Sequence, residues 1–195
     1  MPHALRIGGF VPFTSIDYPE QLSAVVFCQG CPWRCSYCHN QHLLTSRTTG
    51  LLDWHGILKK LHQRQGLLDA VVFSGGEPTL QKSLHHAMEQ VRVMGFKVGL
   101  HTAGCYPERL KSLLPLVDWV GLDIKDLPEN YPSLTGSSSS GGQAWQSLDI
   151  LLSADVPFQV RTTVHPGMTE EQVEQLRTDL SRRGVTDHSL QVCRY

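Results

Sequence analysis

The sequence has no long apolar run and no excess of one charge. No stretch approaches the roughly 20 apolar residues of a transmembrane helix, and residues 1–6 lack the apolar run of a secretory signal peptide. Lys and Arg number 17 against 18 Asp and Glu, so the formal net charge is −1. Nothing in this balance predicts a surface for nucleic acid or membrane. We therefore expect a cytoplasmic protein that binds neither.

Length and composition predict one folded domain. The chain has 195 residues, of which 41% are hydrophobic and 18% are charged. This composition suits a substantial core and argues against disorder. An internal repeat, which would mark a solenoid, is absent. We expect a single domain that spans residues 1–195.

Four of the six cysteines lie between residues 28 and 38. Three of them, Cys31, Cys35 and Cys38, have the spacing Cys-x3-Cys-x2-Cys, and this clustering in a cytoplasmic protein favours metal binding over disulfides. A Cys-x2-Cys pair alone fits half a zinc site or a redox dithiol. A cubane iron–sulfur cluster normally takes four thiolates, so three would leave one iron with an open position. The other cysteines are expected to be buried thiols that pack as small hydrophobic side chains: Cys28, Cys105 and Cys193.

Strand and helix patterns alternate along the chain. Helical stripes follow Asp53, Leu80, Pro107 and Thr169, and a further one contains Trp145. Such alternation predicts βα units and a parallel sheet, either doubly wound or closed as a barrel. The expected strands are 22–27, 70–73, 96–100, 119–124, 158–164 and 189–193.

Chemically versatile side chains follow the ends of these strands. The cysteine loop, residues 74–78, residues 101–104, the pair Asp123 and Lys125, and residues 161–165 each come after a different strand. Because the carboxyl ends of parallel strands meet at one edge, these landmarks predict a single active site there.

A serine-rich stretch follows the fourth expected strand. Residues 137–142, Ser-Ser-Ser-Ser-Gly-Gly, are expected to form a flexible loop at the same edge. It is either a solvated connector or a mobile lid.

Several motifs together resemble one family. Cys31-x3-Cys35-x2-Cys38, with Tyr37 before the last cysteine, is similar to the signature of radical S-adenosylmethionine (SAM) enzymes. In that family the three thiolates hold a [4Fe–4S] cluster, and SAM chelates its open iron. Residues 15–19, 30–40 and 131–136 further resemble the activating proteins of anaerobic ribonucleoside-triphosphate reductase, which activate a glycyl-radical enzyme. The resemblance implies a partial (β/α)6 barrel of parallel strands.

The resemblance also implies the residues that contact SAM. Gly75, Gly76 and Glu77 match the "GGE" motif that supports the methionine amino group. His101-Thr102-Ala103-Gly104 aligns with a segment near the ribose, although His101 and Ala103 replace an Asp and an Asn. That Asp helps hold a cation in related enzymes, and His101 departs from this cation-binding pattern. The remaining implied contacts are Tyr37 at the adenine, Thr102 in the ribose segment, Lys125 at the carboxylate, and Arg161 at a carboxylate or ribose oxygen.

Each of these residues also has a structural interpretation. Tyr37 could buttress the loop, His101 could be an ordinary hydrogen-bonded residue, and Arg161 could form an ion pair with Asp123. Lys125 and Asp123 share one face of a strand end because strand side chains alternate, and they could form a surface ion pair that contributes little to stability.

The implied function is radical-based activation of a protein partner. One electron from a flavodoxin-like donor would cleave SAM to methionine and a 5′-deoxyadenosyl radical, which then removes hydrogen from a glycine of anaerobic ribonucleoside-triphosphate reductase. No general acid or base is required. One alternative is a radical SAM enzyme that acts on a small molecule, of the 7-carboxy-7-deazaguanine synthase type. Another is a non-catalytic iron–sulfur or zinc protein.

Overall fold

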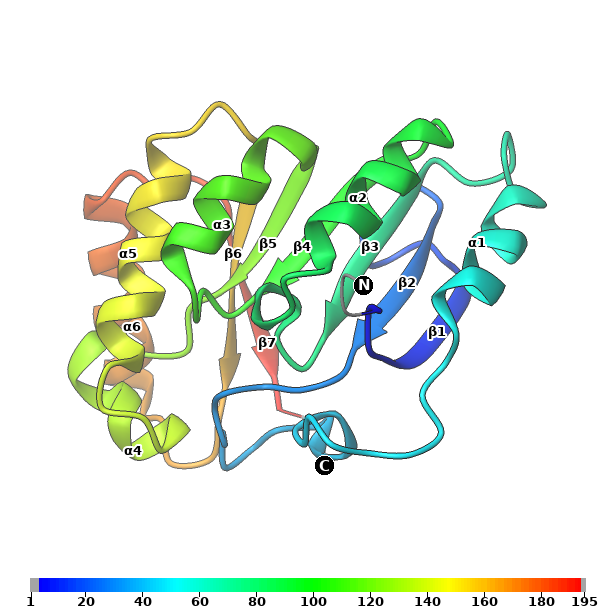
Figure 1. The fold of residues 1–195 in the computed structure, drawn as a ribbon. Helices are drawn as coiled ribbons and strands as arrows, with labels where there is room; N and C mark the ends of the chain where they lie inside the picture. Colours follow the sequence, from blue (N-terminus) through cyan, green and yellow to red (C-terminus); the bar gives the residue numbers. More distant parts are fainter. Residues whose placement is uncertain (1–3, 194–195) are drawn as a thin grey trace.

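The computed structural model of the protein describes residues 4–193. They form a seven-stranded sheet whose strands lie in sequence order (Figure 1). β1 is antiparallel to β2, and every later neighbour pair is parallel. The strands are β1 (Ile7–Thr14), β2 (Ser23–Cys28), β3 (Ala70–Gly75), β4 (Lys97–Thr102), β5 (Trp119–Asp123), β6 (Phe158–Val164) and β7 (His188–Val192).

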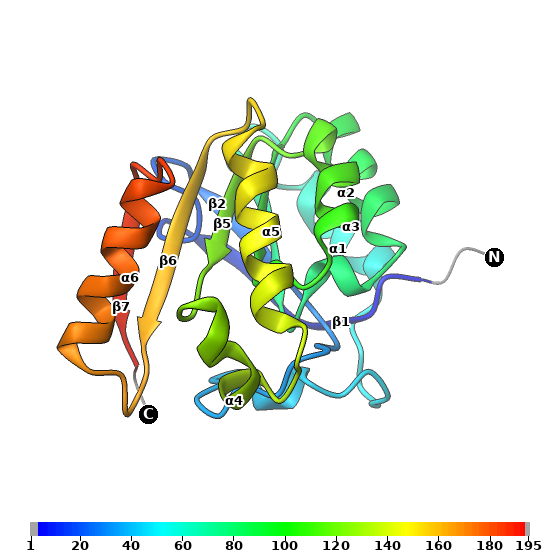
Figure 2. The same cartoon turned by 90° about the vertical axis from the view of Figure 1, so that its left-hand side faces the viewer.

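The sheet is open. β1 and β7 are its two edge strands, and within residues 4–193 no ladder joins them. Figures 1 and 2 show α1, α2, α3 and α5 on one side of the sheet. The six predicted strands are all present as β2 to β7, so the expected parallel α/β fold of a partial barrel is confirmed. The helices are α1 (Trp54–His62), α2 (Leu84–Val93), α3 (Pro107–Leu113), α4 (Tyr131–Thr135), α5 (Ser140–Leu152) and α6 (Glu170–Arg182).

Two helices begin at the predicted residues because of their caps. The Asp53 carboxylate accepts the Gly56 backbone N–H at 2.8 Å and begins α1. Thr169 and Gln172 form a reciprocal capping box that begins α6. Short 3₁₀ turns occupy the connections at η1 (Gln41–Leu43), η2 (Pro78–Leu80), η3 (Leu114–Leu116) and η4 (Pro128–Asn130).

Two parts of the fold differ from the sequence expectation. β1 was not predicted, because its sequence Ile-Gly-Gly-Phe-Val-Pro-Phe-Thr contains glycine and proline, which are rare inside strands. The expectation of a flexible serine-rich loop is wrong for its second half. Ser140 and Gly141 form the first turn of α5 and are buried, and a Cβ on Gly141 would lie 2.1 Å from Pro128 O. The missing side chain therefore allows close packing, and only residues 137–139 lie outside the helices.

The two faces of the sheet are filled differently. The large core lies between the outer face and the helices. A smaller cluster covers the inner face beside the amino-terminal halves of the strands, where Tyr18 stacks on Trp119 with ring centroids 5.3 Å apart. Gly99 lies under Tyr18, since a Cβ there would be 3.1 Å from the Tyr18 ring. Tyr18 thus packs against the inside of the sheet, and together with Asp17 it forms a floor beneath the carboxyl edge, whereas the neighbouring Ile16 is exposed.

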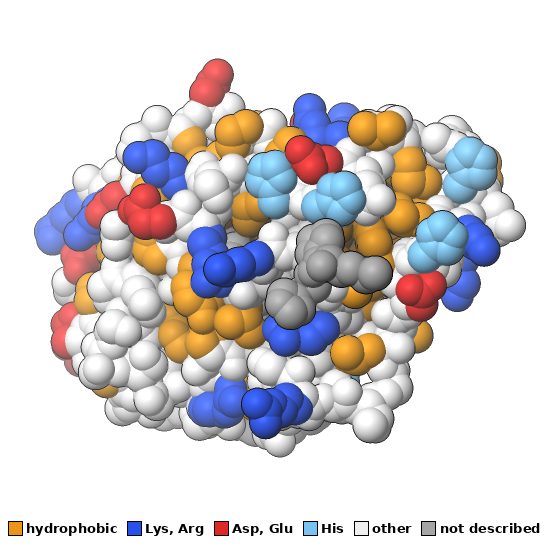
Figure 3. Space-filling model, in the orientation of Figure 1, with side chains coloured by type: hydrophobic (Ala, Val, Ile, Leu, Met, Phe, Trp, Pro, Cys, Tyr) orange, Lys and Arg blue, Asp and Glu red, His pale blue; other side chains and the backbone are white. Residues whose placement is uncertain are grey.

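The surface carries both signs of charge. Figure 3 shows Lys and Arg side chains interspersed with Asp, Glu and His on one face of the molecule. Among residues 4–193 no helix is long and apolar enough to cross a membrane.

Candidate active site

The three clustered cysteines lie in a loop that leaves β2 at the carboxyl edge of the sheet. Cys31, Cys35 and Cys38 are free thiols and line one cavity of about 260 Å³. The loop is anchored by its backbone, because Leu44 O accepts the Cys31 N–H at 3.1 Å and Cys35 O accepts the Cys38 N–H at 3.1 Å. The sequence thus correctly predicts that these thiols face one site.

The thiols differ in their surroundings. A hydrogen bond from the Cys105 thiol and another from the Trp33 backbone outweigh burial and lower the pKa of Cys31. Burial raises the pKa of Cys35, with only partial compensation by the charge of Lys125. Cys28 and Cys105 are buried as expected, whereas Cys193 is only half-buried and its Sγ lies 3.8 Å from His39 Nε2.

Two glycines bring the end of β3 against the cysteine loop. A Cβ on Gly76 would lie 2.4 Å from Gly30 O, and one on Gly75 would lie 2.4 Å from Cys28 N. Gly75 also has a φ of 121°, a backbone conformation that residues with a Cβ rarely adopt. Both glycines line the cavity, so their lack of side chains serves close backbone packing beside the thiols.

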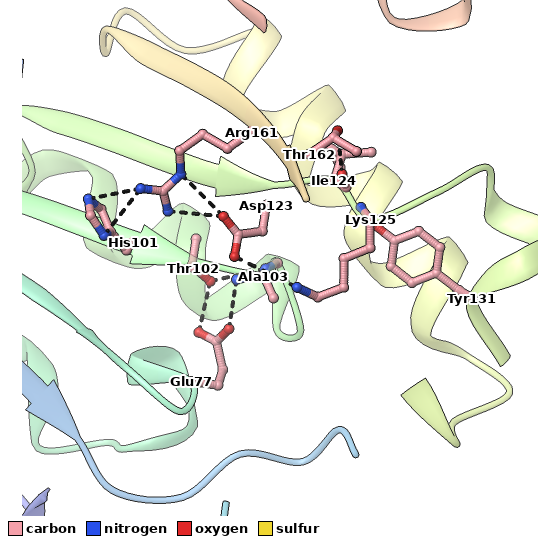
Figure 4. A network of polar contacts seen from close by, with 11 residues as sticks. Glu77, His101, Thr102, Ala103, Asp123, Ile124, Lys125, Tyr131, Arg161 and Thr162 are labelled. Atoms are coloured by element: carbon pink, nitrogen blue, oxygen red, sulfur yellow. Dashed lines mark hydrogen bonds and ion pairs between the residues drawn. The ribbon is translucent and has the colours of Figure 1, made fainter. Parts of the chain in front are cut away.

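Glu77 lies behind the cavity rather than on its wall. Its side chain is fully buried, and it is not among the described residues that line the cavity. Its Oε1 accepts hydrogen bonds from Thr79 N at 3.0 Å, Thr79 Oγ1 at 2.6 Å and Thr102 Oγ1 at 2.8 Å. Its Oε2 accepts the Ala103 N–H at 2.9 Å (Figure 4). The carboxylate therefore ties the β3 turn to the β4 turn.

Thr102 and Ala103 are both cavity-lining residues. The Thr102 hydroxyl donates to Glu77 and accepts the Gly104 N–H at 3.0 Å. This side chain is thus engaged within the protein, and the segment 101–104 is held rigidly at the cavity.

A charged cluster also lines the cavity, and Figure 4 shows its side chains. Arg161 Nε and Nη2 lie 3.2 and 3.0 Å from Asp123 Oδ1, and Lys125 Nζ lies 3.7 Å from Asp123 Oδ2. Burial by itself raises the pKa of Asp123, but Arg161 and then Lys125 outweigh it, so the net shift is downward. Two cations face one carboxylate here, which leaves a net positive charge that suits an anionic ligand group.

His101 connects this cluster to the floor. Its Nε2 lies 2.7 Å from Asp17 O, and Arg161 Nη1 lies 3.3 Å from both ring nitrogens. Burial and then the Arg161 charge lower the pKa of His101 to about 4, so the ring is neutral at pH 7. His101 lines the cavity and is hydrogen-bonded, so the two interpretations offered from the sequence are compatible.

Tyr37 is clamped between the loops that follow β5 and β6. Its ring stacks on His165 with centroids 5.3 Å apart and an interplanar angle of 15°, and Lys125 Nζ lies 5.8 Å from the ring centroid. Burial raises the pKa of Tyr37 to about 12. Its hydroxyl is buried without a hydrogen-bond partner in the described part of the chain, which marks a polar atom suited to a ligand at this wall.

The structure therefore gathers nearly all of the predicted residues around one cavity. Glu77 alone stands behind the wall. Four further lining residues belong to segments that the sequence analysis singled out without giving these residues a role, Trp33, His39, Asn40 and Thr163, and two were not singled out, Leu44 and Gln191. His39 and Asn40 adjoin the motif and could have been found from it, whereas Gln191 of β7 comes from the far end of the chain.

Comparison with known families agrees with this geometry. Residues 25–180 match the radical SAM superfamily. Because the match spans most of the chain, the protein belongs to the radical SAM superfamily, whose members use a [4Fe–4S] cluster and SAM.

The most informative relatives are named as activating enzymes. A Methanocaldococcus jannaschii protein named as a glycyl-radical enzyme activating enzyme is 31% identical over an alignment of 180 residues, and the alignment covers 87% of this chain and 73% of that protein. The pyruvate formate-lyase-activating enzyme of Clostridium pasteurianum is 31% identical over an alignment of 173 residues, and the alignment covers 86% of this chain and 71% of that one. The 7-carboxy-7-deazaguanine synthase of Thermococcus kodakarensis is 42% identical, but over only 62 residues, 31% of this chain and 24% of that one.

A solved structure shows the same fold. Streptococcus suis SuiB bound to S-adenosylmethionine superposes with a TM-score of 0.69 at 13% identity. The superposition covers 86% of this chain and 39% of the longer SuiB chain.

The residues of the cavity fit the two cofactors. Among residues 4–193 no three His, Cys, Asp or Glu side chains converge as they would on a single metal ion. A cubane cluster has a different requirement, since each thiolate binds a different iron. Three thiols on one cavity wall meet that requirement, and the cationic wall and the unpartnered Tyr37 hydroxyl offer polar contacts for SAM.

Proposed function

We propose that this protein is a glycyl-radical-activating enzyme. The observation that carries the proposal is that three cysteine thiols and the cations Lys125 and Arg161 line the same cavity. When bound there, a reduced [4Fe–4S] cluster and SAM together supply a 5′-deoxyadenosyl radical that removes hydrogen from a glycine Cα. Because the cofactors carry the chemistry, the protein's task is to bind, orient and exclude water.

Each wall of the cavity has a separate task. Cys31, Cys35 and Cys38 would hold the [4Fe–4S] cluster through their thiolates, and with only three protein ligands the cluster could also bind SAM. Lys125 and Arg161 attract its carboxylate, because their combined charge exceeds that of Asp123. The backbone of Gly75 and Gly76 accepts the methionine amino group, with Tyr37 beside the adenine. Thr102 would form part of the ribose wall, and Glu77 holds that wall from behind through its hydrogen bonds to Thr102 and Ala103.

A protein substrate suits the open sheet. Two further hollows adjoin the cavity and share His39 with it. One of them extends along the edge strand β7 at residues 190–192. A glycine-bearing loop of a partner could approach along this side. The names of the relatives from M. jannaschii and C. pasteurianum support a glycyl-radical protein as the partner.

For the particular partner we propose anaerobic ribonucleoside-triphosphate reductase. Its support is the resemblance of residues 15–19 and 131–136 to activators of that enzyme. The pyruvate formate-lyase-activating relative favours a second candidate, a lyase of that type. We further propose a cytoplasmic location and a flavodoxin-like donor, with no nucleic acid or membrane as partner.

One assay separates these proposals from their rivals. The protein is reconstituted anaerobically, reduced with dithionite, and mixed with SAM and either the reductase or the lyase. A glycyl-radical doublet by electron paramagnetic resonance (EPR) on the reductase alone supports the first partner, and on the lyase alone the second.

The same assay also tests the two rival activities. Formation of 5′-deoxyadenosine with no radical on either protein favours the 7-carboxy-7-deazaguanine synthase type, which shares a short similar segment. Absence of 5′-deoxyadenosine favours a non-catalytic metal protein.

A further inference from the structure

The short helix α4 lies against the cysteine loop. The last carbonyls of a helix lack partners within it. Here they accept N–H groups of that loop, Thr135 O from Arg34 N at 2.8 Å and Leu134 O from Ser36 N at 3.3 Å. The segment 131–136 thus supports the backbone that presents the thiols.

Tyr131, the first residue of α4, contacts both sides of the cavity from outside it. Its side chain is fully buried, and it is not among the described residues that line the cavity. Its hydroxyl accepts the Lys125 backbone N–H at 2.8 Å, as Figure 4 shows. Its ring meets Trp33 of the cysteine loop edge-on, with centroids 5.8 Å apart at 77°.

The helix itself is firmly placed. The Thr135 hydroxyl donates to Tyr131 O at 2.9 Å and lies 2.7 Å from Ser140 Oγ, at the start of α5. Gly136 ends α4 in the left-handed conformation at φ 71°. Because α5 packs in the main core, α4 is a rigid spacer rather than a mobile flap.

We propose that Tyr131 is a positioning residue that sets the separation between the cluster thiolates and Lys125. This inference rests on the proposed function, in which SAM binds the open iron at one end of the cavity and Lys125 at another. Tyr131 touches neither cofactor. It fixes the Lys125 backbone through its hydroxyl and the cysteine loop through its ring.

The test is Tyr131→Phe in the reconstituted full-length protein. The ring and its packing on Trp33 remain, but the part-buried Lys125 N–H loses its acceptor, a loss that is costly in proteins. We expect unchanged iron content and an unchanged spectrum of the reduced cluster without SAM. We expect the SAM concentration that half-saturates the EPR change to rise about tenfold. Tyr106→Phe, on a tyrosine outside the cavity that stacks on Arg109, is the matched control and should leave that value unchanged.

A second variant shows whether the effect passes through Lys125. In a Lys125→Ala background, Tyr131→Phe should change SAM affinity less than twofold, because coupled residues are not additive. The inference is overturned if Tyr131→Phe alone leaves SAM affinity unchanged or lowers the iron content. It is also overturned if Tyr131→Phe lowers SAM affinity the full tenfold in the Lys125→Ala background. A wild-type cluster that shows no EPR change with SAM contradicts the proposed function instead.

Discussion

Glu77 offers the sharpest test of how the cavity walls are joined. Glu77→Ala would remove the acceptor of two backbone N–H groups, those of Thr79 and Ala103, and of two hydroxyls. The hydroxyls can rotate to other acceptors, but the buried N–H groups cannot. Each unsatisfied donor costs about 1–3 kcal/mol. Relief of a buried carboxylate offsets part of this cost, so we expect a net loss of about 3 kcal/mol.

The effect is measured as a melting temperature. For a protein of this size about 1 kcal/mol corresponds to roughly 2–4 °C, so Glu77→Ala should melt about 9 °C lower at equal iron content. Glu77→Gln keeps the three hydrogen bonds to Oε1 but turns an amide donor toward the Ala103 N–H. Its melting temperature should fall by about a third as much as that of Glu77→Ala. The control is Glu89→Ala, at a half-exposed carboxylate on α2, which should change the unfolding free energy by less than about 0.5 kcal/mol. A Glu77→Ala protein that melts within 3 °C of wild type would refute the reasoning.

Three further predictions concern the charged wall. Gly121→Ala would place a Cβ 2.9 Å from Arg161 Cζ and 3.1 Å from His101 Cδ2, so it should weaken SAM binding about tenfold in an equilibrium binding assay. Arg161→Lys loses the two hydrogen bonds to Asp123 and should also weaken SAM binding about tenfold. The pKa of His101 falls from 6.5 to about 4 on folding, so between these pH values His101 binds a proton in the unfolded chain but not in the folded protein. The unfolding free energy therefore keeps its full value above pH 6.5 and decreases as the pH falls toward 4. Between pH 7 and pH 5 wild type should lose about 2 kcal/mol more unfolding free energy than His101→Gln, and equal losses would contradict this assignment.

The sequence predicts the location of the site because of a rule about parallel sheets. Motifs after β2, β3, β4, β5 and β6 had to meet at one edge once the strands were parallel. The three thiols, Lys125 and Arg161 therefore lie around one cavity as expected.

The remaining features depend on contacts between distant parts of the chain. Asp17 and His101 are 84 residues apart in sequence, and no local pattern shows that Tyr18 packs against the inner face of the sheet. The direction of the Glu77 side chain depends on partners in the next βα unit. Ser140 and Gly141 have the composition of a loop, but packing against Pro128 places them in a helix.

The central claim is that three thiolates leave one iron of a cluster open to SAM. It is tested most directly by anaerobic reconstitution, metal analysis, and measurement of 5′-deoxyadenosine after dithionite and SAM are added. The account predicts about four irons per chain, formation of 5′-deoxyadenosine, and loss of that product when Cys31, Cys35 or Cys38 is replaced by alanine. A protein that binds zinc in place of iron, or an intact cluster that yields no 5′-deoxyadenosine, would contradict it.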